Sequence, residues 1–385
     1  LDQAMPMGYS SAGTIVELGK GVEGFQVGQR VACAGGGYAV HAEYALIPQN
    51  LLAPLPDSVD FESAAFSTLG AIALHGFRLA DVQIGARVAV IGLGLLGQLA
   101  ADIARAAGCQ VLGIDLDMGR AASAQARGTH AVLRDVAVEE ARVFSQDAGF
   151  DAVLVCADTE SNDPVELAGE IARERAKVVV VGAVGMEVPR RLYYAKELSL
   201  VVSRSYGPGR YDPGYEEAGL DYPIGYVRWT EGRNLAAFVD LLAQNAVNVT
   251  SLISHRFPID NAAQAYELIK SGEDFLGVLI SYQQEDQWPL EKSIQVGRPR
   301  PALAGEKVRL GVLGAGNFAR ATMLPAIKGI KELDLLAIAS ASGLAASELA
   351  KRYKFQRAAS DAEELYRSED LDAIAVLTRH HLHAS

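Results

Sequence analysis

The sequence has few cysteines, and this scarcity excludes several architectures. Its 385 residues include only three, Cys33, Cys109 and Cys156, which are far apart and mostly embedded in apolar segments. An odd number of isolated cysteines argues against a disulfide framework or a cysteine-rich zinc knot. It is typical of buried thiols in a reducing cytosol, so we expect a cytoplasmic protein.

The sequence also lacks an excess of positive charge and any long hydrophobic run. Asp and Glu number 47 against 35 Lys and Arg, which gives a formal net charge of −12. No basic face is therefore expected for nucleic acid or for an anionic membrane surface. No apolar stretch approaches the ~20 residues of a membrane-spanning helix, and no signal peptide is visible. The expected partner is a small molecule.

The most informative stretch is residues 88–97, an apolar run that ends in Gly-x-Gly-x-x-Gly and leads into an expected helix over residues 98–107. In a dinucleotide-binding unit Gly92 makes the tight turn, Gly94 lets the backbone approach a pyrophosphate, and Gly97 lets the helix pack close to the strand. The pyrophosphate sits at the helix N-terminus, where unpaired N–H groups favour anions. The alternative is a glycine-rich turn without a ligand.

An acidic residue supports the nucleotide interpretation. Asp115 ends a second apolar run, at the distance from the glycines where a dinucleotide-binding unit needs a carboxylate to bind the ribose 2′-hydroxyl. The same carboxylate repels a 2′-phosphate, so we expect NAD, with NADP less favoured, at this first site. Its predicted cofactor-binding residues are Gly92, Gly94, Leu95, Leu96, Gly97 and Asp115.

The pattern along residues 1–283 indicates an α/β fold. Short Val, Ile and Tyr runs at 13–18, 28–33 and 41–47 predict a small antiparallel β-barrel or part of one. A helix is expected from Phe61 through Arg78. Strands and helices then alternate, which predicts a doubly wound parallel sheet. The expected strands are 88–91, 110–114, 131–133, 152–155, 177–181 and 198–203.

The later segments predict a return to the first domain and then a linker. Helices are expected at 233–244 and 261–271, and strands at 252–257 and 277–281. A polar stretch with three prolines follows and has linker composition. The expected division is 1–80 for the barrel, 81–245 for the dinucleotide-binding domain, 246–283 for the return, 284–306 for the linker and 307–385 for a second Rossmann domain.

That second domain begins with another glycine turn. Residues 307–319 read as a strand running into Gly-x-Gly-x-x-Ala, in which Ala319 still permits close helix packing. The next strand, 335–339, ends in Ser340 without a carboxylate, and no Arg or Lys stands close in sequence to bind a 2′-phosphate. Either NAD or NADP is therefore possible, and so is a site without function. The predicted binding residues are Gly314, Gly316, Asn317, Phe318 and Ser340.

Three features of residues 1–282 resemble the medium-chain dehydrogenase/reductase family. Residues 6–22 are similar to that family's Gly-His-Glu-x-Ala-Gly segment and the strand after it, and residues 25–31 to its Phe-x-Val-Gly-Asp-Arg-Val. The order of barrel, Rossmann unit and returning helix and strand also matches. The resemblance implies a partial GroES-like barrel and a nicotinamide-dependent enzyme resembling zinc-type alcohol dehydrogenases.

The remainder, from Lys307, resembles the start of the glucose-fructose oxidoreductase (Gfo/Idh/MocA) family. Residues 378–383 stand where that family has its Thr-Pro-Asn-His-x-x-His strand end. Both resemblances in one chain match bi-domain oxidoreductases. Because the chain starts at Leu1 and stops soon after the apolar run 373–377, we expect both ends to be truncated, with the second Rossmann domain incomplete.

The departures from the first family concern zinc. Tyr9 stands at the position of a ligand His, Ser10 replaces the Glu after it, and Thr68 aligns with a second ligand Cys. Phenol and hydroxyl groups are poor zinc ligands. The four-cysteine structural lobe is also missing, because residues 35–44 cross that region directly. We therefore expect no zinc.

Without a metal, a positioned side chain must handle the substrate's proton. Tyr9 is the first candidate because the family places a metal ligand there, although a packed barrel tyrosine would look the same. His41 and Thr68 are further candidates, with a surface histidine and a helix N-cap as their plain alternatives. The resemblance also places Cys156, Gly182 and Ala183 along the cofactor.

An aromatic and basic loop suggests either a substrate contact or a subunit contact. It runs over residues 203–211 and is followed by further Tyr, Arg and Trp residues up to Trp229. Our first expectation is a zinc-independent NAD(P)-dependent oxidoreductase that acts on an alcohol or carbonyl such as a sugar derivative and forms a homo-oligomer. The alternatives are an enone reductase similar to quinone oxidoreductases and a non-catalytic dinucleotide-binding module.

Overall fold

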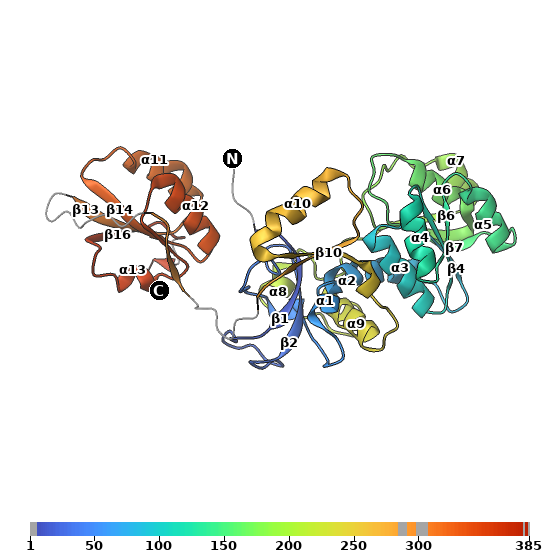
Figure 1. The fold of residues 1–385 in the computed structure, drawn as a ribbon, viewed down its shortest axis with the longest axis horizontal. Coiled ribbons are helices and arrows are strands. Elements are labelled where there is room, and N and C mark those ends of the chain that lie inside the picture. Colours follow the sequence, from blue (N-terminus) through green and yellow to red (C-terminus); the bar gives the residue numbers. More distant parts are fainter. Residues whose placement is uncertain (1–5, 284–290, 298–306, 380–381, 384–385) are drawn as a thin grey trace. The chain divides into compact units, whose positions relative to one another are not determined.

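The expected α/β architecture is confirmed. The structure is a computed structural model that describes residues 6–283, 291–297, 307–379 and 382–383. The chain divides into two compact units, residues 7–283 and residues 284–385 (Figure 1). None of the helices in the described ranges has the length and apolar character to cross a membrane.

The first unit starts with a small antiparallel sheet of three strands. β1 (Ser10–Thr14) pairs with β2 (Arg30–Ala34), which pairs with β3 (Leu52–Pro54) after a short 3-10 turn, η1 (Gln49–Leu51). Residues 41–47, expected as a strand, instead form bends at 41–44 and no regular structure at 45–47. The expectation was wrong there because this apolar run pairs with no strand among the described residues, and the third strand begins at Leu52 instead.

The helix expected from Phe61 to Arg78 is two helices. α1 (Phe61–Ala64) is capped by Asp60, whose carboxylate accepts from the Ser63 amide, and α2 (Ser67–Ala80) begins after a break at residues 65–66. α2 packs closely on its neighbours through glycine. A Cβ on Gly70 would lie 2.3 Å from the Phe238 ring, and one on Gly76 would lie 2.6 Å from Val181.

A six-stranded parallel sheet follows, in the order β6-β5-β4-β7-β8-β9, with helices between its strands. Its strands are β4 (Arg87–Ile91), β5 (Gln110–Asp115), β6 (His130–Leu133), β7 (Phe150–Val155), β8 (Ala172–Val180) and β9 (Ser199–Val202). Its helices are α3 (Leu95–Ala106), α4 (Met118–Ala126), α5 (Ala137–Ser145), α6 (Asp163–Ile171) and α7 (Arg190–Ala195). All six expected strands are present, within a few residues of their expected bounds.

Both faces of this sheet are covered, as its nearly continuous apolar strands require. Val88 and Val90 of β4 pack into one core with residues of α2, α3 and α4, whereas Ala89 and Ile91 pack into a second core with α5, α6 and α7 (Figure 1). The carboxyl ends of the strands are thus the one edge where a ligand meets backbone from several strands.

The chain then returns toward the barrel. α8 (Pro213–Glu216) precedes α9 (Glu231–Ala243), and α9 packs on α2. The 3-10 turn η2 (Thr250–Leu252) leads into β10 (Ile253–Pro258), and η3 (Ile259–Asn261) and α10 (Ala262–Ser271) connect it to β11 (Gly277–Ser281). β10 and β11 pair in parallel as a separate two-stranded sheet.

The second unit holds a five-stranded sheet in the order β12-β15-β14-β13-β16. β13 (Val308–Leu313), β14 (Leu333–Ala339), β15 (Arg357–Ala359) and β16 (Ala373–Val376) are parallel, with helices η4 (Ala319–Met323), α11 (Leu324–Ile327), α12 (Gly343–Tyr353) and α13 (Glu363–Tyr366). β12 (Ser293–Gln295) pairs antiparallel with β15 although it lies in the expected linker. The linker's residues 284–290 and 298–306 lie outside the described residues.

Candidate functional site

The first glycine turn has the geometry that its sequence predicts. The Gly92 amide donates to the Ile114 carbonyl at 2.8 Å, and its φ of +91° is a conformation that favours glycine. A Cβ on Gly92 would lie 2.6 Å from the Ala157 nitrogen. A Cβ on Gly97 would lie 1.7 Å from the Gly92 carbonyl oxygen. Both positions therefore exclude any larger residue.

Gly94 differs from the other two glycines because the space beside it is open. A Cβ there would meet nothing within 4 Å. Gly94 is the N-cap of α3 and supplies no side-chain cap, so the amides of Leu95 and Leu96 begin the helix without a side-chain partner at the cap. Such an end binds phosphate oxygens through amide groups and the helix dipole. The turn thus fits a dinucleotide pyrophosphate.

Asp115 is 8% exposed and is held by the backbone on both sides. One carboxylate oxygen accepts from the Leu93 amide at 2.5 Å and the other from the Asp117 amide at 2.8 Å. Each oxygen retains a further lone pair for a ligand hydroxyl. These bonds fix the carboxylate beside the glycine turn, where a ribose would follow the pyrophosphate.

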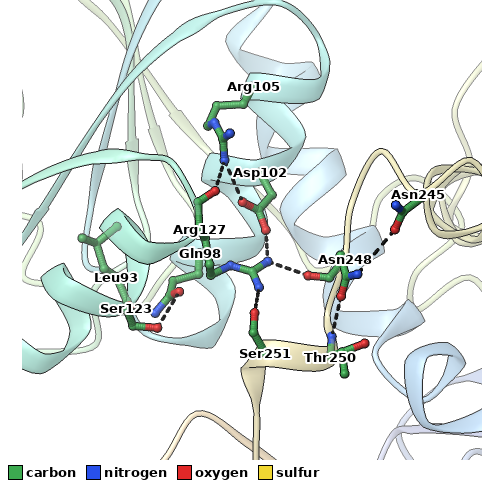
Figure 2. Close-up of polar contacts among 10 residues, drawn as sticks. All are labelled: Leu93, Gln98, Asp102, Arg105, Ser123, Arg127, Asn245, Asn248, Thr250 and Ser251. Atoms are coloured by element: carbon green, nitrogen blue, oxygen red, sulfur yellow. Dashed lines mark hydrogen bonds and ion pairs between the residues drawn. The ribbon is translucent and has the colours of Figure 1, made fainter.

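A polar network under the turn holds α3 in place, and sequence reasoning did not find it (Figure 2). Gln98 Nε2 donates to the Leu93 carbonyl at 3.0 Å, and the Ser123 hydroxyl of α4 donates to Gln98 Oε1 at 3.2 Å. Deeper along α3, Asp102 pairs with Arg127, which also donates to the Asn248 carbonyl at 2.7 Å. Burial raises the pKa of Asp102, although Arg127 opposes this effect.

Figure 2 shows that Arg127 also reaches Ser251, so this one guanidinium joins α3 and α4 to the segment before β10. A shallow cavity of about 560 Å³ lies over it, lined by Arg105, Asn245 and Asn248 among others. The only signal in the sequence was a pair of opposite charges on two different helices, which no local pattern connects.

The ends of β7 and β8 lie beside the turn. The Cys156 amide donates to the Ile91 carbonyl at 2.7 Å, and the Gly182 amide donates to the Val155 carbonyl at 2.9 Å. A Cβ on Gly182 would lie 2.0 Å from the Ala157 carbonyl oxygen, so glycine is required. The Ala183 carbonyl accepts from the Thr159 amide. Burial raises the pKa of Cys156 to about 12, so its thiol stays neutral at physiological pH.

The three candidates for proton handling lie in one neighbourhood of the barrel. Thr68 Oγ1 lies 3.2 Å from the Tyr9 carbonyl and 3.3 Å from the Cys33 carbonyl, and it is fully buried. The Ser10 hydroxyl donates to the Ala65 carbonyl at 2.6 Å and accepts from the Thr68 amide at 3.2 Å. Both hydroxyls are thus engaged with the backbone, and Thr68 is better suited to bracing α2 than to meeting a substrate.

Tyr9 and His41 are more accessible. Tyr9 is 45% exposed, and partial burial of its phenol raises its pKa. The His41 ring lies against Gly8, where a Cβ would come within 2.8 Å of it, and makes an edge contact with Tyr266 at 6.1 Å between ring centroids. Burial lowers the pKa of His41, which keeps its imidazole neutral. Across the described ranges, no group of three or more His, Cys, Asp or Glu side chains is arranged to hold a metal ion.

The second glycine turn repeats part of the first. The Gly314 amide donates to the Ala339 carbonyl at 2.8 Å with φ of +111°, and a Cβ on Gly316 would meet nothing within 4 Å. Asn317 is exposed, as is Phe318, and Ser340 follows β14 directly. The turn leads into the π-helical turn η4 rather than a regular α-helix.

Three family models match successive parts of the chain. Residues 1–57 match the alcohol dehydrogenase GroES-like domain, residues 96–218 the zinc-binding dehydrogenase model, and residues 308–385 the oxidoreductase family with an NAD-binding Rossmann fold. These three segments correspond, in order, to the barrel, the first parallel sheet and the second sheet.

Individual relatives agree with these models. The chain is 27% identical to a sorbitol dehydrogenase of Halalkalibacterium halodurans, over 69% of this chain and 80% of the relative. It is 25% identical to a D-xylulose reductase of Scheffersomyces stipitis, over 73% of this chain and 83% of the relative. The fold is similar to 2R,3R-butanediol dehydrogenase from Bacillus subtilis, with a TM-score of 0.59 at 20% identity, covering 72% of this chain and 80% of that one.

These matches and the geometry of the two glycine turns lead to one assignment. The chain belongs to the medium-chain dehydrogenase/reductase family of NAD(P)-dependent oxidoreductases, in its zinc-type alcohol dehydrogenase-like branch related to the polyol dehydrogenases, and its C-terminal part belongs to the Gfo/Idh/MocA family of Rossmann proteins.

Proposed function

We propose that residues 1–283 interconvert a hydroxyl-rich alcohol, such as a polyol or sugar derivative, and its carbonyl with NAD and without zinc. The substrate class is supported by the relatives that are named for sorbitol and D-xylulose. The preference for NAD is supported by the buried carboxylate of Asp115 beside the open face of Gly94.

The proposal that the enzyme works without zinc rests on the side chains near Tyr9. Zinc prefers thiolate, imidazole and carboxylate ligands, whereas this place offers the Tyr9 phenol and the hydroxyls of Ser10 and Thr68. The two hydroxyls are bonded to the backbone, and the phenol is neutral because its pKa is raised. The described residues at this place therefore do not fit zinc.

The nicotinamide supplies the redox chemistry, and the chain supplies position and proton handling. The amides at the start of α3 hold the pyrophosphate, and Asp115 orients a ribose through its hydroxyls. A neutral phenol at Tyr9 can donate a hydrogen bond to the substrate oxygen and so stabilise the charge that develops there.

The cofactor part of this proposal is tested by fluorescence titration with NADH and NADPH, with zinc assayed in the same preparation. Gly94→Asp places a carboxylate where nothing now lies within 4 Å, so NADH binding at the first site should be lost while the fold remains. Gly316→Asp is the matched control at the second turn. The part of the NADH titration that this variant loses is binding at the second site. NADH binding by the Gly316→Asp variant that is unchanged when Gly94→Asp is added would contradict the first site.

The catalytic part is tested by turnover of sorbitol with NAD and of D-xylulose with NADH. Tyr9→Phe should reduce kcat by about 100-fold if its hydroxyl is the donor, since general acid–base groups contribute roughly 10²–10⁴. Unchanged kcat would exclude Tyr9 from that role. Turnover that requires stoichiometric zinc would overturn the metal-free part alone.

A further inference from the structure

Glu231 is a deeply buried carboxyl group of the first unit that is poorly satisfied. It is 1% exposed at the start of α9, and neither of its oxygens has a well-formed hydrogen bond among the described residues. The neighbouring Tyr206 hydroxyl is also buried and without a well-formed bond. Buried polar groups are almost always paired, so each such group needs a physical reason.

These orphan groups are concentrated in the loop over residues 203–211 and at the start of α9. Four of the buried side-chain atoms that lack a partner in the described part of the chain belong to residues between 203 and 231, namely the Ser203 hydroxyl, the Tyr206 hydroxyl and both Glu231 oxygens. A hydroxyl or a neutral carboxyl can donate and accept at once, as sugar hydroxyls do. These residues thus hold hydrogen-bond donors and acceptors without partners, which the hydroxyls of a polyol could pair with.

The electrostatic surroundings keep Glu231 neutral. Burial and the nearby Glu216 carboxylate raise the pKa of Glu231 to about 8, while Arg210, Arg204 and the adjacent Tyr206 hydroxyl partly oppose this effect. Arg210 is itself engaged, because it pairs with Glu216 at 2.5 Å. Further titratable groups lie around this loop. Tyr206 and Tyr211 belong to the loop, and Tyr215 and Tyr222 follow it in the chain. Tyr38 of the barrel lies near Arg210 and Glu216, and α2 contributes His75 and Arg78.

The loop lies at the carboxyl edge of the parallel sheet, where ligands of such folds bind. The Ser203 amide donates to the Val180 carbonyl at 2.8 Å, which places the start of the loop at the end of β8. A Cβ on Gly207 would lie 3.3 Å from the His75 ring, and one on Gly36 of the barrel would lie 3.7 Å from Arg210. The loop therefore spans from the sheet edge to the barrel.

Two residues of the loop hold costly backbone conformations, Ser205 with φ of +53° and Tyr211 with φ of +68°. Gly207 and Gly209 have φ of +119° and +110°, which glycine adopts without strain. A Cβ on Gly209 would come within 2.7 Å of Tyr215. Strain of this kind persists only where the surrounding structure enforces it, which is common at ligand sites.

We propose that Glu231, as a neutral acid, and the adjacent Tyr206 hydroxyl form a subsite that binds a substrate hydroxyl remote from the reacting carbon. This inference rests on the proposed function and makes Glu231 a specificity-determining residue. The neutral carboxyl donates to the substrate oxygen, and the substrate hydroxyl donates in turn to the carboxyl or phenol oxygen. A simple alcohol lacks that hydroxyl and gains nothing from the subsite.

The test compares sorbitol with propan-2-ol, using NAD and the intact chain. Glu231→Leu and Tyr206→Phe should raise KM for sorbitol by about 10–100-fold, because a site built to bond a hydroxyl is left with unpaired groups. KM for propan-2-ol and the Kd for NADH should change less than twofold. Tyr226→Phe removes the hydroxyl of a 91% exposed tyrosine from the same stretch and should change the KM of neither substrate.

The titration of Glu231 gives a second readout. Its carboxyl is neutral below its pKa of about 8, so KM for sorbitol should rise as the pH increases through 8 while KM for propan-2-ol stays level. Glu231→Gln keeps an amide donor and acceptor and cannot titrate. It should therefore preserve KM for sorbitol at pH 7 and abolish the rise, and it guards against a Leu variant that does not fold. The same titration can be measured without turnover. The rise in unfolding temperature that sorbitol causes in the NADH complex should become smaller as the pH increases through 8.

The outcomes separate the inference from the function on which it rests. Wild-type turnover of both substrates, with equal effects of the variants on each, would show that Glu231 only packs the loop and would overturn the subsite. Turnover of propan-2-ol without any use of sorbitol would do the same. A wild-type chain that binds NADH but oxidises neither substrate would overturn the proposed function and the subsite together.

Discussion

The two glycine turns of this chain differ where their sequences differ. In each, the first glycine donates its amide at 2.8 Å to a carbonyl at the end of the next strand, and the second glycine faces open space. The turns diverge at the third position, where Gly97 stands in one and Ala319 in the other. They diverge again at the end of the next strand, where Asp115 corresponds to Ser340.

The helix after each turn shows the same divergence. α3 continues for 12 residues without a break, whereas η4 is a π turn in which the Leu324 amide donates to the Ala319 carbonyl. Pro325 follows at once, and a proline clashes with the carbonyl four residues before it, so the wider turn relieves that clash. A shared glycine pattern thus specifies the turn itself, while the neighbouring residues decide how closely the helix approaches it.

The largest expected effect concerns the third position. Gly97→Ala would place a Cβ 1.7 Å from the Gly92 carbonyl oxygen, a backbone atom that cannot move without opening the turn. We expect the free energy of unfolding to fall by roughly 3–5 kcal/mol, at the upper end for single substitutions. Chemical denaturation of the first unit, followed by tryptophan fluorescence, measures this change.

The matched substitution at the second turn should be mild. Ala319 is fully buried and already accommodated, so Ala319→Gly removes one methyl group and adds backbone freedom. A loss of about 1 kcal/mol is expected. Equal destabilisation by the two substitutions would mean that the turns are packed alike, and the comparison above would fail.

At the acid of the first turn we expect an effect smaller than that of Gly97→Ala. Asp115→Asn keeps the shape of the side chain and one acceptor for the backbone amides. It removes the negative charge that is proposed to bind a ribose 2′-hydroxyl. The Kd for NADH should rise by about tenfold, equivalent to ~1.4 kcal/mol, while the Kd for NADPH changes little. The ratio of the two constants, measured by titration in a Gly316→Asp background, reports the first site alone. A ratio unchanged from wild type would exclude Asp115 from ribose recognition.

Local patterns in the sequence were sufficient for the parallel sheets but not for the barrel. The strands β4 and β7 were predictable because continuous apolar runs ended in glycine or helix signals. Residues 41–47 contain an apolar run of the kind found in strands, yet strand pairing depends on a partner that is distant in sequence. For the same reason β12 was read as linker, because its partner β15 comes much later in the chain.

The residues of the candidate site also divide into those that a local sequence pattern indicates and those that depend on distant parts of the chain. Gly92, Gly94, Gly97 and Asp115 could be named from spacing alone, because the turn is local and each residue's task follows from sterics or charge. Glu231 and the Asp102–Arg127 pair could not, because burial and the absence of partners are properties of the folded chain. Thr68 shows the converse case. Its position suggested a substrate contact, whereas its hydroxyl lies within hydrogen-bond distance of two backbone carbonyls, which the sequence did not indicate.

The smallest expected effect is a gain rather than a loss. Ser340 occupies the place in the second turn that Asp115 occupies in the first, since Gly314 bonds the carbonyl of Ala339 just as Gly92 bonds that of Ile114. Ser340→Asp should therefore introduce a carboxylate beside the turn, where it can bind a ribose 2′-hydroxyl and repel a 2′-phosphate. In a Gly94→Asp background, which leaves the second site alone to bind, the preference for NADH over NADPH should increase by about threefold to tenfold. The gain is limited because the π turn at η4 changes how its first amides are presented to a phosphate. If preference shifts toward NADPH instead, the two turns are not equivalent, and position 340 does not face the ribose.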